Sequence, residues 1–281
     1  MAGGLWFAED QQQGLELSFK IKNTLVSKQT KYQKLDIYET YKHGILFTLD
    51  DFVMTTEHDE FVYHELIAHV PLFSHKHLEN VLIIGGGDGG TAREVVKHPV
   101  TKIDMVEIDE EVVEMSKKYM PSLSKELTNP KVHLFFQDGV EFVQNTASEY
   151  DLIIIDSTDP LGPGEGLFDT EFYRTCLTAL KDRGILVAQA ESPFDNPNRV
   201  EQIFSKLRNV FPVVSAYTGI IPTYPGGLWC FAFCCKEPEA LNFFDEARYN
   251  ALQLELRYYN KRIHTACFAL PEFVKTLCQT E

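Results

Sequence analysis

Five acidic residues in the middle of the chain follow directly on predicted strands. They are Asp88, Glu107, Asp138, Asp156 and Asp159. Because ligands of open parallel sheets bind at the carboxyl ends of the strands, we expect these carboxylates to gather at one edge of a sheet. Such an edge favours a cationic ligand, since each ammonium group can pair with a carboxylate.

One of these acids is also placed to accept a proton. An alkylamine has a pKa of about 10, so removing its proton at pH 7 costs roughly 4 kcal/mol. A carboxylate held against the amine can take that proton while the amine attacks an electrophile. Asp156, fixed at the end of the apolar run 150–155, is the better candidate for this base, and Asp159 would hold a second positive group.

Aromatic residues accompany the acids. The segment IPTYPGGLW brings Tyr224 and Trp229 near the same edge, where their rings can bind a cation. Tyr63 and His64 stand side by side on a predicted helix over residues 57–70, which Pro71 follows. Taken alone, their spacing indicates ordinary packing on a helix face.

The glycine-rich segment from Gly85 to Gly90 follows the apolar run 81–84. Gly85, Gly87 and Gly90 satisfy the pattern G-x-G-x-x-G, which is typical of a dinucleotide site. Asp88 lies inside this turn and would repel a pyrophosphate. We therefore interpret the turn as a nucleoside site whose nearby substituent is positive. The alternative is a purely structural turn with a solvated aspartate.

A sulfonium nucleoside fits these acids as the electrophile. Glu107, about 20 residues after the first glycine, would bind the ribose hydroxyls, and Asp138 would bind the adenine amino group. Asp88 would face the side chain of the nucleoside, where the carboxylate of S-adenosylmethionine is repelled and the ammonium of its decarboxylated form is attracted. This charge favours aminopropyl transfer over methyl transfer.

The elements that position these residues alternate between strands and helices. Strand, turn, helix and strand follow one another over residues 81–109, and further repeats continue to about residue 209, which predicts an α/β fold with a parallel sheet. Residues 1–55 show the period of strands and predict a small antiparallel β domain, followed by a Rossmann-like catalytic domain over residues 56–281. The segment 157–168 is rich in proline and glycine, as in a loop that closes over a site or in a plain surface connection.

Composition excludes several classes of protein. The chain has 281 residues and a net charge of −15, which disfavours nucleic acid and suits a small cation, although many acidic proteins are simply soluble. It has no apolar run of membrane-spanning length and no signal peptide, so we expect a cytoplasmic protein with no membrane partner. Six scattered cysteines without a C-x-x-C pair indicate free thiols, and the histidines lack the spacing of a zinc site, so no metal is expected.

The sequence resembles the spermidine synthase (polyamine aminopropyltransferase) family over nearly its whole length, in particular its bacterial putrescine-using members. The matching segments are DEFVYHE at 59–65, GGGDGG, VEID, QDG at 137–139, DSTDPLGP and IPTYPGGLW. This resemblance implies a class I methyltransferase-like sheet behind the N-terminal β domain. It also implies transfer of the aminopropyl group of decarboxylated S-adenosylmethionine, a co-substrate rather than a cofactor, to putrescine. Spermidine and 5′-methylthioadenosine would be the products, and a homodimer or homotetramer the assembly.

The resemblance also implies roles for individual residues. Asp156 is the implied proton acceptor. The implied polyamine-site residues are Tyr63, His64, Asp88, Asp156, Asp159, Tyr224 and Trp229. The implied contacts to the nucleoside are Gln33, Gly85, Gly87, Asp88, Glu107, Asp138, Gly139 and Pro163, of which Gln33 has the shortest matching context.

Two alternatives stay open at this point. One is an S-adenosylmethionine-dependent N-methyltransferase of small molecules on the same sheet. The other is a non-catalytic nucleoside-binding homologue, which would be expected to lack an acid at position 156 or 159, whereas this chain has both. The choice among putrescine, cadaverine, agmatine and a triamine as acceptor depends on pocket depth, which sequence does not give.

Overall fold

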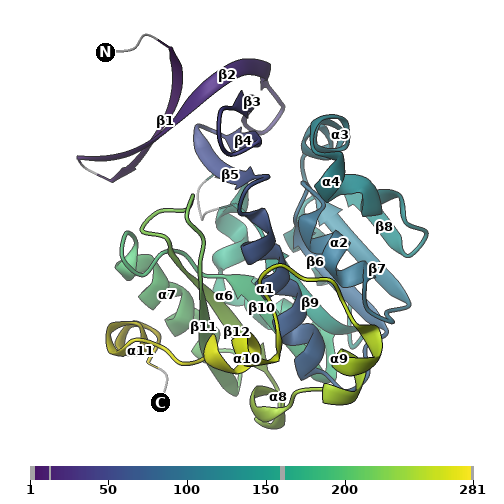
Figure 1. Ribbon diagram of the computed structural model, residues 1–281. Coiled ribbons are helices and arrows are strands. Elements are labelled where there is room, and N and C mark those ends of the chain that lie inside the picture. The colour runs from purple at the N-terminus through teal and green to yellow at the C-terminus, as the bar shows by residue number, and fades with distance from the viewer. Residues whose placement is uncertain (1–3, 13, 159–161, 280–281) are drawn as a thin grey trace.

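The computed structural model describes residues 4–12, 14–158 and 162–279. Its N-terminal part is a sheet of five antiparallel strands in the order β1-β2-β3-β4-β5 (Figure 1). The strands are β1 (Leu5–Gln12), β2 (Leu15–Gln29), β3 (Lys34–Thr40), β4 (Ile45–Leu49) and β5 (Phe52–Thr56). Alternate apolar residues such as Phe7, Phe19 and Leu46 pack together on one face, as the period of two predicts. The antiparallel N-terminal β unit is therefore confirmed, whereas the division of the chain at residue 55 stays a prediction.

The larger part is built on a seven-stranded sheet in the order β11-β12-β10-β9-β6-β7-β8. The strands are β6 (Asn80–Gly85), β7 (Lys102–Glu107), β8 (Val132–Phe136), β9 (Tyr150–Asp156), β10 (Leu180–Gln189), β11 (Val213–Ile220) and β12 (Leu228–Cys235). Strands β8, β7, β6, β9 and β10 are parallel, and β12 and β11 are antiparallel to their neighbours. The predicted α/β fold with a Rossmann-like sheet is confirmed, and an antiparallel pair, β11 and β12, closes one edge of the sheet.

Helices cover both faces of this sheet, so its central strands read as continuous apolar runs (Figure 1). One face is covered by α1 (Glu60–Ser74), α2 (Gly90–Val96), α3 (Glu110–Tyr119), α8 (Glu239–Asn242), α9 (Glu246–Leu252) and α10 (Lys261–Ala266). The other face is covered by α5 (Gly139–Gln144), α6 (Thr170–Ala179), α7 (Pro197–Arg208) and α11 (Glu272–Cys278). Three shorter elements complete the structure: α4 (Pro121–Ser124) and the 3₁₀ helices η1 (Lys125–Thr128) and η2 (Gly162–Phe168).

The strand order reverses between β6 and β9, and this topological switch point brings the glycine turn beside Asp156. Gly85 is the register partner of Asp156, and the backbone N–H of Gly86 donates to the Asp156 carbonyl at 2.8 Å. Gly85 has a φ of +83°, and a Cβ added there would lie 2.1 Å from that carbonyl oxygen. Only glycine therefore allows the two strand ends to meet this closely.

One local prediction was wrong. Pro71 does not follow the first helix but lies inside α1, which runs on to Ser74. The next residues, Leu72 and Phe73, are fully buried, so tertiary packing outweighs the helix-breaking tendency of proline.

No helix among the described residues is both long enough and apolar enough to cross a membrane.

Candidate active site

A cavity opens at the carboxyl ends of the parallel strands, between the sheet and the N-terminal β unit. Phe47, Leu49 and Met54 contribute to its wall from the N-terminal strands. The charged and polar residues in its described lining are Gln33, Tyr63, His64, Asp88, Glu107, Asp138, Asp156, Ser157, Thr158 and Tyr224. Four of these are acids, and no lysine or arginine is among the described lining residues. The predicted gathering of acids at one edge is therefore observed for Asp88, Glu107, Asp138 and Asp156.

Asp156 is the last residue of β9 and has both carboxylate oxygens occupied by hydroxyl donors. The Tyr63 hydroxyl donates to Oδ1 at 2.7 Å, and the Thr91 hydroxyl donates to Oδ2 at 2.7 Å. Burial raises the pKa of Asp156, as does the Asp88 carboxylate, whereas the positive charge of His64 and the two hydroxyl donors lower it. A carboxyl group with a raised pKa is a stronger base than a solvated aspartate, as proton transfer from an amine requires.

Asp88 is held in the glycine turn with one oxygen toward the backbone and the other toward a histidine. Its Oδ1 accepts the backbone N–H of Gly90 at 2.8 Å, and its Oδ2 lies 3.4 Å from Nε2 of His64. Gly85 and Gly87 line the cavity beside it. Asp88, whose charge makes this turn unsuitable for a pyrophosphate, therefore lines the cavity. Its nearest cationic group is the side chain of His64.

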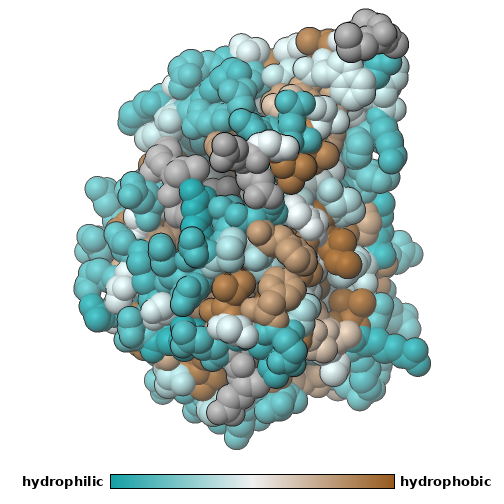
Figure 2. Space-filling model, turned by 90° about the vertical axis from the view of Figure 1, so that its left-hand side faces the viewer, coloured by the Kyte–Doolittle hydropathy of each residue, from teal (hydrophilic) through white to brown (hydrophobic). Residues whose placement is uncertain are grey.

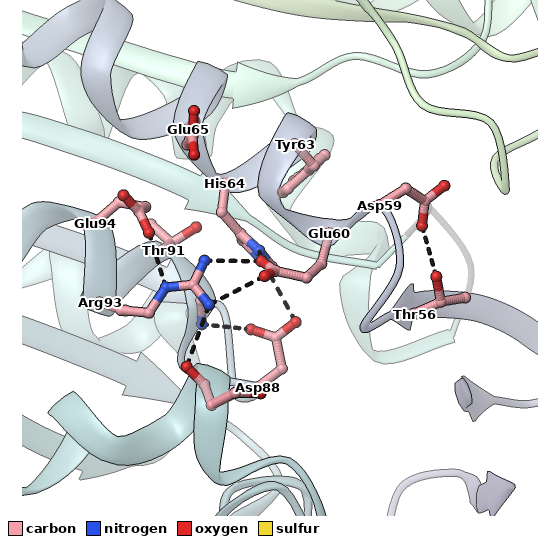
Figure 3. A network of polar contacts seen from close by, with 12 residues as sticks. Thr56, Asp59, Glu60, Tyr63, His64, Glu65, Asp88, Thr91, Arg93 and Glu94 are labelled. Carbon is pink, nitrogen blue, oxygen red and sulfur yellow. Dashed lines mark hydrogen bonds and ion pairs between the residues drawn. The ribbon is translucent and has the colours of Figure 1, made fainter. Parts of the chain in front are cut away.

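His64 belongs to a chain of ionic contacts between α1 and α2 (Figure 3). Its Nδ1 lies 2.6 Å from the Glu60 carboxylate, and Arg93 contacts both oxygens of Glu60 at 3.1 and 2.8 Å. Burial disfavours the imidazolium, but the carboxylates of Asp88 and Glu60 outweigh burial and raise the pKa of His64 to about 10. Burial likewise opposes ionisation of Glu60, but His64 and Arg93 lower its pKa to about 2. His64 is thus a cation at neutral pH.

Glu107 is the last residue of β7 and also lines the cavity. Its Oε1 accepts the backbone N–H of Asp109 at 3.0 Å, and its side chain is buried. Burial and the nearby Asp109 carboxylate raise the pKa of Glu107 to about 7, although backbone N–H groups partly oppose this. Glu107 is therefore a hydrogen-bond acceptor whose charge changes near neutral pH.

Three more predicted nucleoside contacts lie around Glu107. Asp138 caps α5 by accepting the Val140 N–H at 2.7 Å, and Asp138 and Gly139 both line the cavity. Gln33 also lines it, and its side-chain amide donates to Asp109 at 3.2 Å. Ile84, Val106 and Leu167 supply apolar walls between them, which suits a flat base.

The aromatic residues separate this cavity from a smaller hollow. Tyr63 and Tyr224 line both spaces, with ring centroids 5.8 Å apart, and the Tyr224 hydroxyl donates to the Met54 carbonyl. The ring centroids of Trp229 and Tyr224 lie 4.8 Å apart. Trp229 lines the smaller hollow but not the larger cavity. Pro163 lies in η2, and Asp159 lies outside the described residues.

Several site residues were missed by the sequence analysis. Glu9 and Gln189 line the smaller hollow. Glu9 carried no signal, because nothing in the sequence predicts that β1 lies against the site, whereas Gln189 ends the parallel strand β10 and its position was a usable signal. Thr91 contacts Asp156, and its place directly after the glycine turn was a usable signal. Glu60 and Arg93 were missed because their spacing suggests only a polar helix surface.

Comparison with known proteins yields two family matches. Residues 60–245 match the spermine/spermidine synthase domain, and residues 5–57 match the spermidine synthase tetramerisation domain. A polyamine aminopropyltransferase of Alkaliphilus metalliredigens is 50% identical over 274 residues, which cover 96% of each chain. One of Thermoanaerobacter pseudethanolicus is 46% identical over 275 residues, which cover 97% of this chain and 98% of the relative.

Solved structures agree with these matches. A spermidine synthase in complex with the transition state analogue AdoDATO has a TM-score of 0.95 and 41% identity, covering 98% of this chain and 95% of its own. A spermidine synthase from Thermotoga maritima has a TM-score of 0.94 and 40% identity, with coverage of 98% and 94%.

Proposed function

Because the chain belongs to the spermine/spermidine synthase family and is a polyamine aminopropyltransferase, we propose that it transfers the aminopropyl group of decarboxylated S-adenosylmethionine to putrescine, with Asp156 as proton acceptor. The observation that carries this proposal is the position of Asp156. Its carboxylate borders the cavity beside Tyr63, Ser157, Thr158 and Tyr224, which also line the smaller hollow. A base at this boundary can contact an amine from the hollow and a donor from the cavity.

The reaction is a displacement at carbon. The amine nitrogen of putrescine forms a bond to the propyl carbon next to sulfur, the carbon–sulfur bond breaks, and its electron pair stays on the sulfur of 5′-methylthioadenosine. The proton that the amine loses goes to Asp156. Deprotonating a solvated alkylamine at pH 7 costs roughly 4 kcal/mol, and a positioned base with a raised pKa lowers this cost.

The donor would occupy the larger cavity. Glu107 would accept hydrogen bonds from the ribose, while Asp138 and Gly139 would lie at the adenine, between the apolar side chains of Ile84 and Leu167. Asp88 would bind the ammonium group of the aminopropyl tail. His64 lies 3.4 Å from Asp88 and balances part of its charge, but Asp88 lines the cavity and its carboxylate favours a positive tail over a negative one.

The acceptor would extend into the smaller hollow. Putrescine has a second ammonium group four carbons from the first, and the hollow is lined by the acid Glu9 together with Gln189 and Trp229. Glu9 is the one acid in the described lining of this hollow, which suits a single further ammonium group, as in a diamine. Arginine and lysine are not found in the described lining of either space, so two cationic substrates meet little repulsion there.

A product assay tests this proposal. The purified protein would be incubated with decarboxylated S-adenosylmethionine and one of putrescine, cadaverine, agmatine or spermidine, and the products identified by mass spectrometry. We expect spermidine and 5′-methylthioadenosine from putrescine, in the highest yield of the panel. Methylated amines formed from intact S-adenosylmethionine, or a preference for spermidine, would contradict the proposal.

We also propose that the chain assembles as a homotetramer. A tetramer with dihedral symmetry needs two different self-complementary faces. One is offered by the β1–β2 hairpin, where Leu5, Trp6 and Leu15 are exposed. A second lies where Figure 2 shows hydrophobic residues grouped on the side that carries β11 and α11, elements to which the exposed Ile220 and Phe273 belong. Light scattering on Trp6→Glu and Ile220→Glu variants is expected to give dimers in each case, and an unchanged mass in either would contradict this assembly.

A further inference from the structure

Thr91 is a buried hydroxyl residue that contacts the proposed base from behind. It lies in the first turn of α2, has no exposed surface, and donates from Oγ1 to Oδ2 of Asp156 at 2.7 Å. It is absent from the lining of both the cavity and the hollow. Thr91 therefore has no described route to a substrate except through Asp156.

The surroundings of Asp156 oppose its ionisation. It is partly buried at a strand end, and the carboxylates of Asp88 and Glu107 face the same cavity. Against these stand the imidazolium of His64 from α1 and the hydroxyls of Tyr63 from α1 and Thr91 from α2. The other titratable groups in the described wall of the cavity are Asp138 and Tyr224.

The two hydroxyl donors are not equivalent. Tyr63 lines the cavity and the hollow, so its hydroxyl is open to exchange partners when an amine arrives. Thr91 is enclosed, and its bond to Oδ2 restrains the plane of the carboxylate, while Oδ1 accepts the hydroxyl of Tyr63. Hydrogen bonds to an ionised acceptor are stronger than those to a neutral one, so this bond favours the carboxylate over the carboxylic acid.

We propose that Thr91 is a positioning residue, which keeps Asp156 ionised and oriented for proton transfer by a hydrogen bond from the first turn of α2. This inference rests on the proposed role of Asp156 as proton acceptor. Thr91 touches no substrate, so its effect is on the acid limb of the pH profile rather than on substrate binding.

The test is the dependence of kcat on pH in Thr91→Val, which keeps the branched shape and removes the donor. Losing one hydrogen bond to a charged group raises the pKa of Asp156 by about one unit. At the midpoint of the wild-type acid limb, kcat is then about fivefold lower in the variant, while at pH 9 the two enzymes are nearly equal. The assay uses saturating decarboxylated donor and putrescine, so that the donor is bound at Glu107 throughout and changes in its binding do not affect kcat. His64 stays protonated over pH 5–9, because its pKa is about 10, and so does not contribute to the acid limb.

Two further variants separate positioning from packing. Thr91→Ser keeps the hydroxyl, so its acid limb is expected at the wild-type pH. Thr56→Val is the matched control, because the Thr56 hydroxyl is fully buried and donates to Asp59 at 2.6 Å (Figure 3). Neither residue belongs to the described lining of the cavity. Thr56→Val is expected to lower Tm without moving the acid limb. An unmoved acid limb in Thr91→Val, or the same displacement in Thr56→Val, would overturn the inference.

A second measurement does not need turnover. The side-chain carboxyl carbon of Asp156, assigned by comparison with Asp156→Asn, is titrated by ¹³C NMR in wild type and in Thr91→Val, or in Thr91→Ala if the valine variant does not fold. A higher pKa in the variant supports the positioning role, and an equal pKa overturns it. Absence of spermidine formation in the wild-type enzyme would instead contradict the proposed function, so the two failures are distinguishable.

Discussion

Both ends of the seven-stranded sheet carry buried acids, but their partners differ. At the amino ends of the strands, Asp104 of β7 lies 2.8 Å from the Lys102 ammonium and accepts the Tyr150 hydroxyl at 2.7 Å. Asp151 of β9 lies 2.9 Å from Lys181. At the carboxyl ends of the same two strands stand Glu107 and Asp156, and no lysine or arginine contacts either of them in the described part of the chain.

This difference distinguishes acids that stabilise the fold from acids whose charge can bind a ligand. A buried carboxylate beside its own lysine is neutralised within the chain, and its removal leaves a gap in a structural pair. A carboxylate with only hydroxyl and amide partners keeps its charge available, at a cost in stability that a cationic substrate offsets on binding. Strands β7 and β9 carry one acid of each kind, so position along the strand rather than residue type decides the role.

The comparison is tested most strongly at Asp156. Asp156→Asn keeps the shape of the side chain and removes the base, so kcat for spermidine formation is expected to fall by about 10² to 10⁴. Asp104→Asn is the matched change near the amino end of β7, away from the cavity, and is expected to leave kcat nearly unchanged. Steady-state kinetics on both variants decide the matter: near-normal turnover in Asp156→Asn would remove the assignment of the base.

The next effect concerns stability at the amino ends. Lys102→Met leaves Asp104 buried without its cation and is expected to lower the free energy of unfolding by about 2 kcal/mol, since Lys102 is itself partly exposed. Asp156→Asn is expected to raise the free energy of unfolding. The pKa of Asp156 is raised in the folded protein, so at pH 8 its ionised carboxylate is less favourable in the folded than in the unfolded chain. Denaturant unfolding at pH 8 compares the two, and a loss of stability in Asp156→Asn would break the distinction between the two ends.

Asp88 sharpens the comparison through ligand charge. Asp88→Asn is expected to weaken binding of decarboxylated S-adenosylmethionine by about tenfold, the worth of one charge-assisted hydrogen bond of about 1.4 kcal/mol. Intact S-adenosylmethionine, whose carboxylate would meet the same oxygen, is expected to lose less or to gain affinity. Calorimetric titration of both nucleosides into wild type and variant measures this, and an equal loss for both would show that Asp88 does not select by charge.

The smallest expected effect is the pH dependence of nucleoside binding at Glu107. A carboxyl group whose pKa is raised to about 7 is mostly protonated at pH 6 and mostly ionised at pH 8. Its bonds to ribose hydroxyls are stronger in the ionised form but not lost in the protonated one, so affinity for 5′-methylthioadenosine is expected to be about fivefold higher at pH 8 than at pH 6. Glu107→Gln is expected to bind more weakly and equally at both pH values. A pH-independent affinity in wild type would place the ribose elsewhere.

Much of this site follows from local sequence patterns. The continuous apolar runs predict buried parallel strands, and the residues that end such runs, Glu107 and Asp156, fall at one edge because parallel strands all end on the same side. The glycine turn and the N-terminal strands were likewise predictable from period and composition. These features depend only on neighbours in sequence and on one topological rule.

The remaining features depend on contacts between distant segments. Glu9 of β1 lines the smaller hollow together with residues of the seven-stranded sheet, and no pattern within residues 5–29 predicts that placement. The imidazolium state of His64 depends on Glu60, four residues earlier, and on Asp88 from the distant glycine turn. Helix α1 continues past Pro71 because the core holds its last turn. Sequence periodicity predicts which side of a helix or strand is buried, but not which residues of another segment pack against that side.

The register between β6 and β9 has a consequence for how this protein can vary among its relatives. Gly85 and Asp156 are partners across these two strands, so the donor turn and the base are set by counting residues along both. An insertion or deletion of one residue within 81–84 or 152–155 would turn every later side chain of that strand to the opposite face. Natural length variation should therefore accumulate in loops and terminal helices, while these two short segments keep a fixed number of residues.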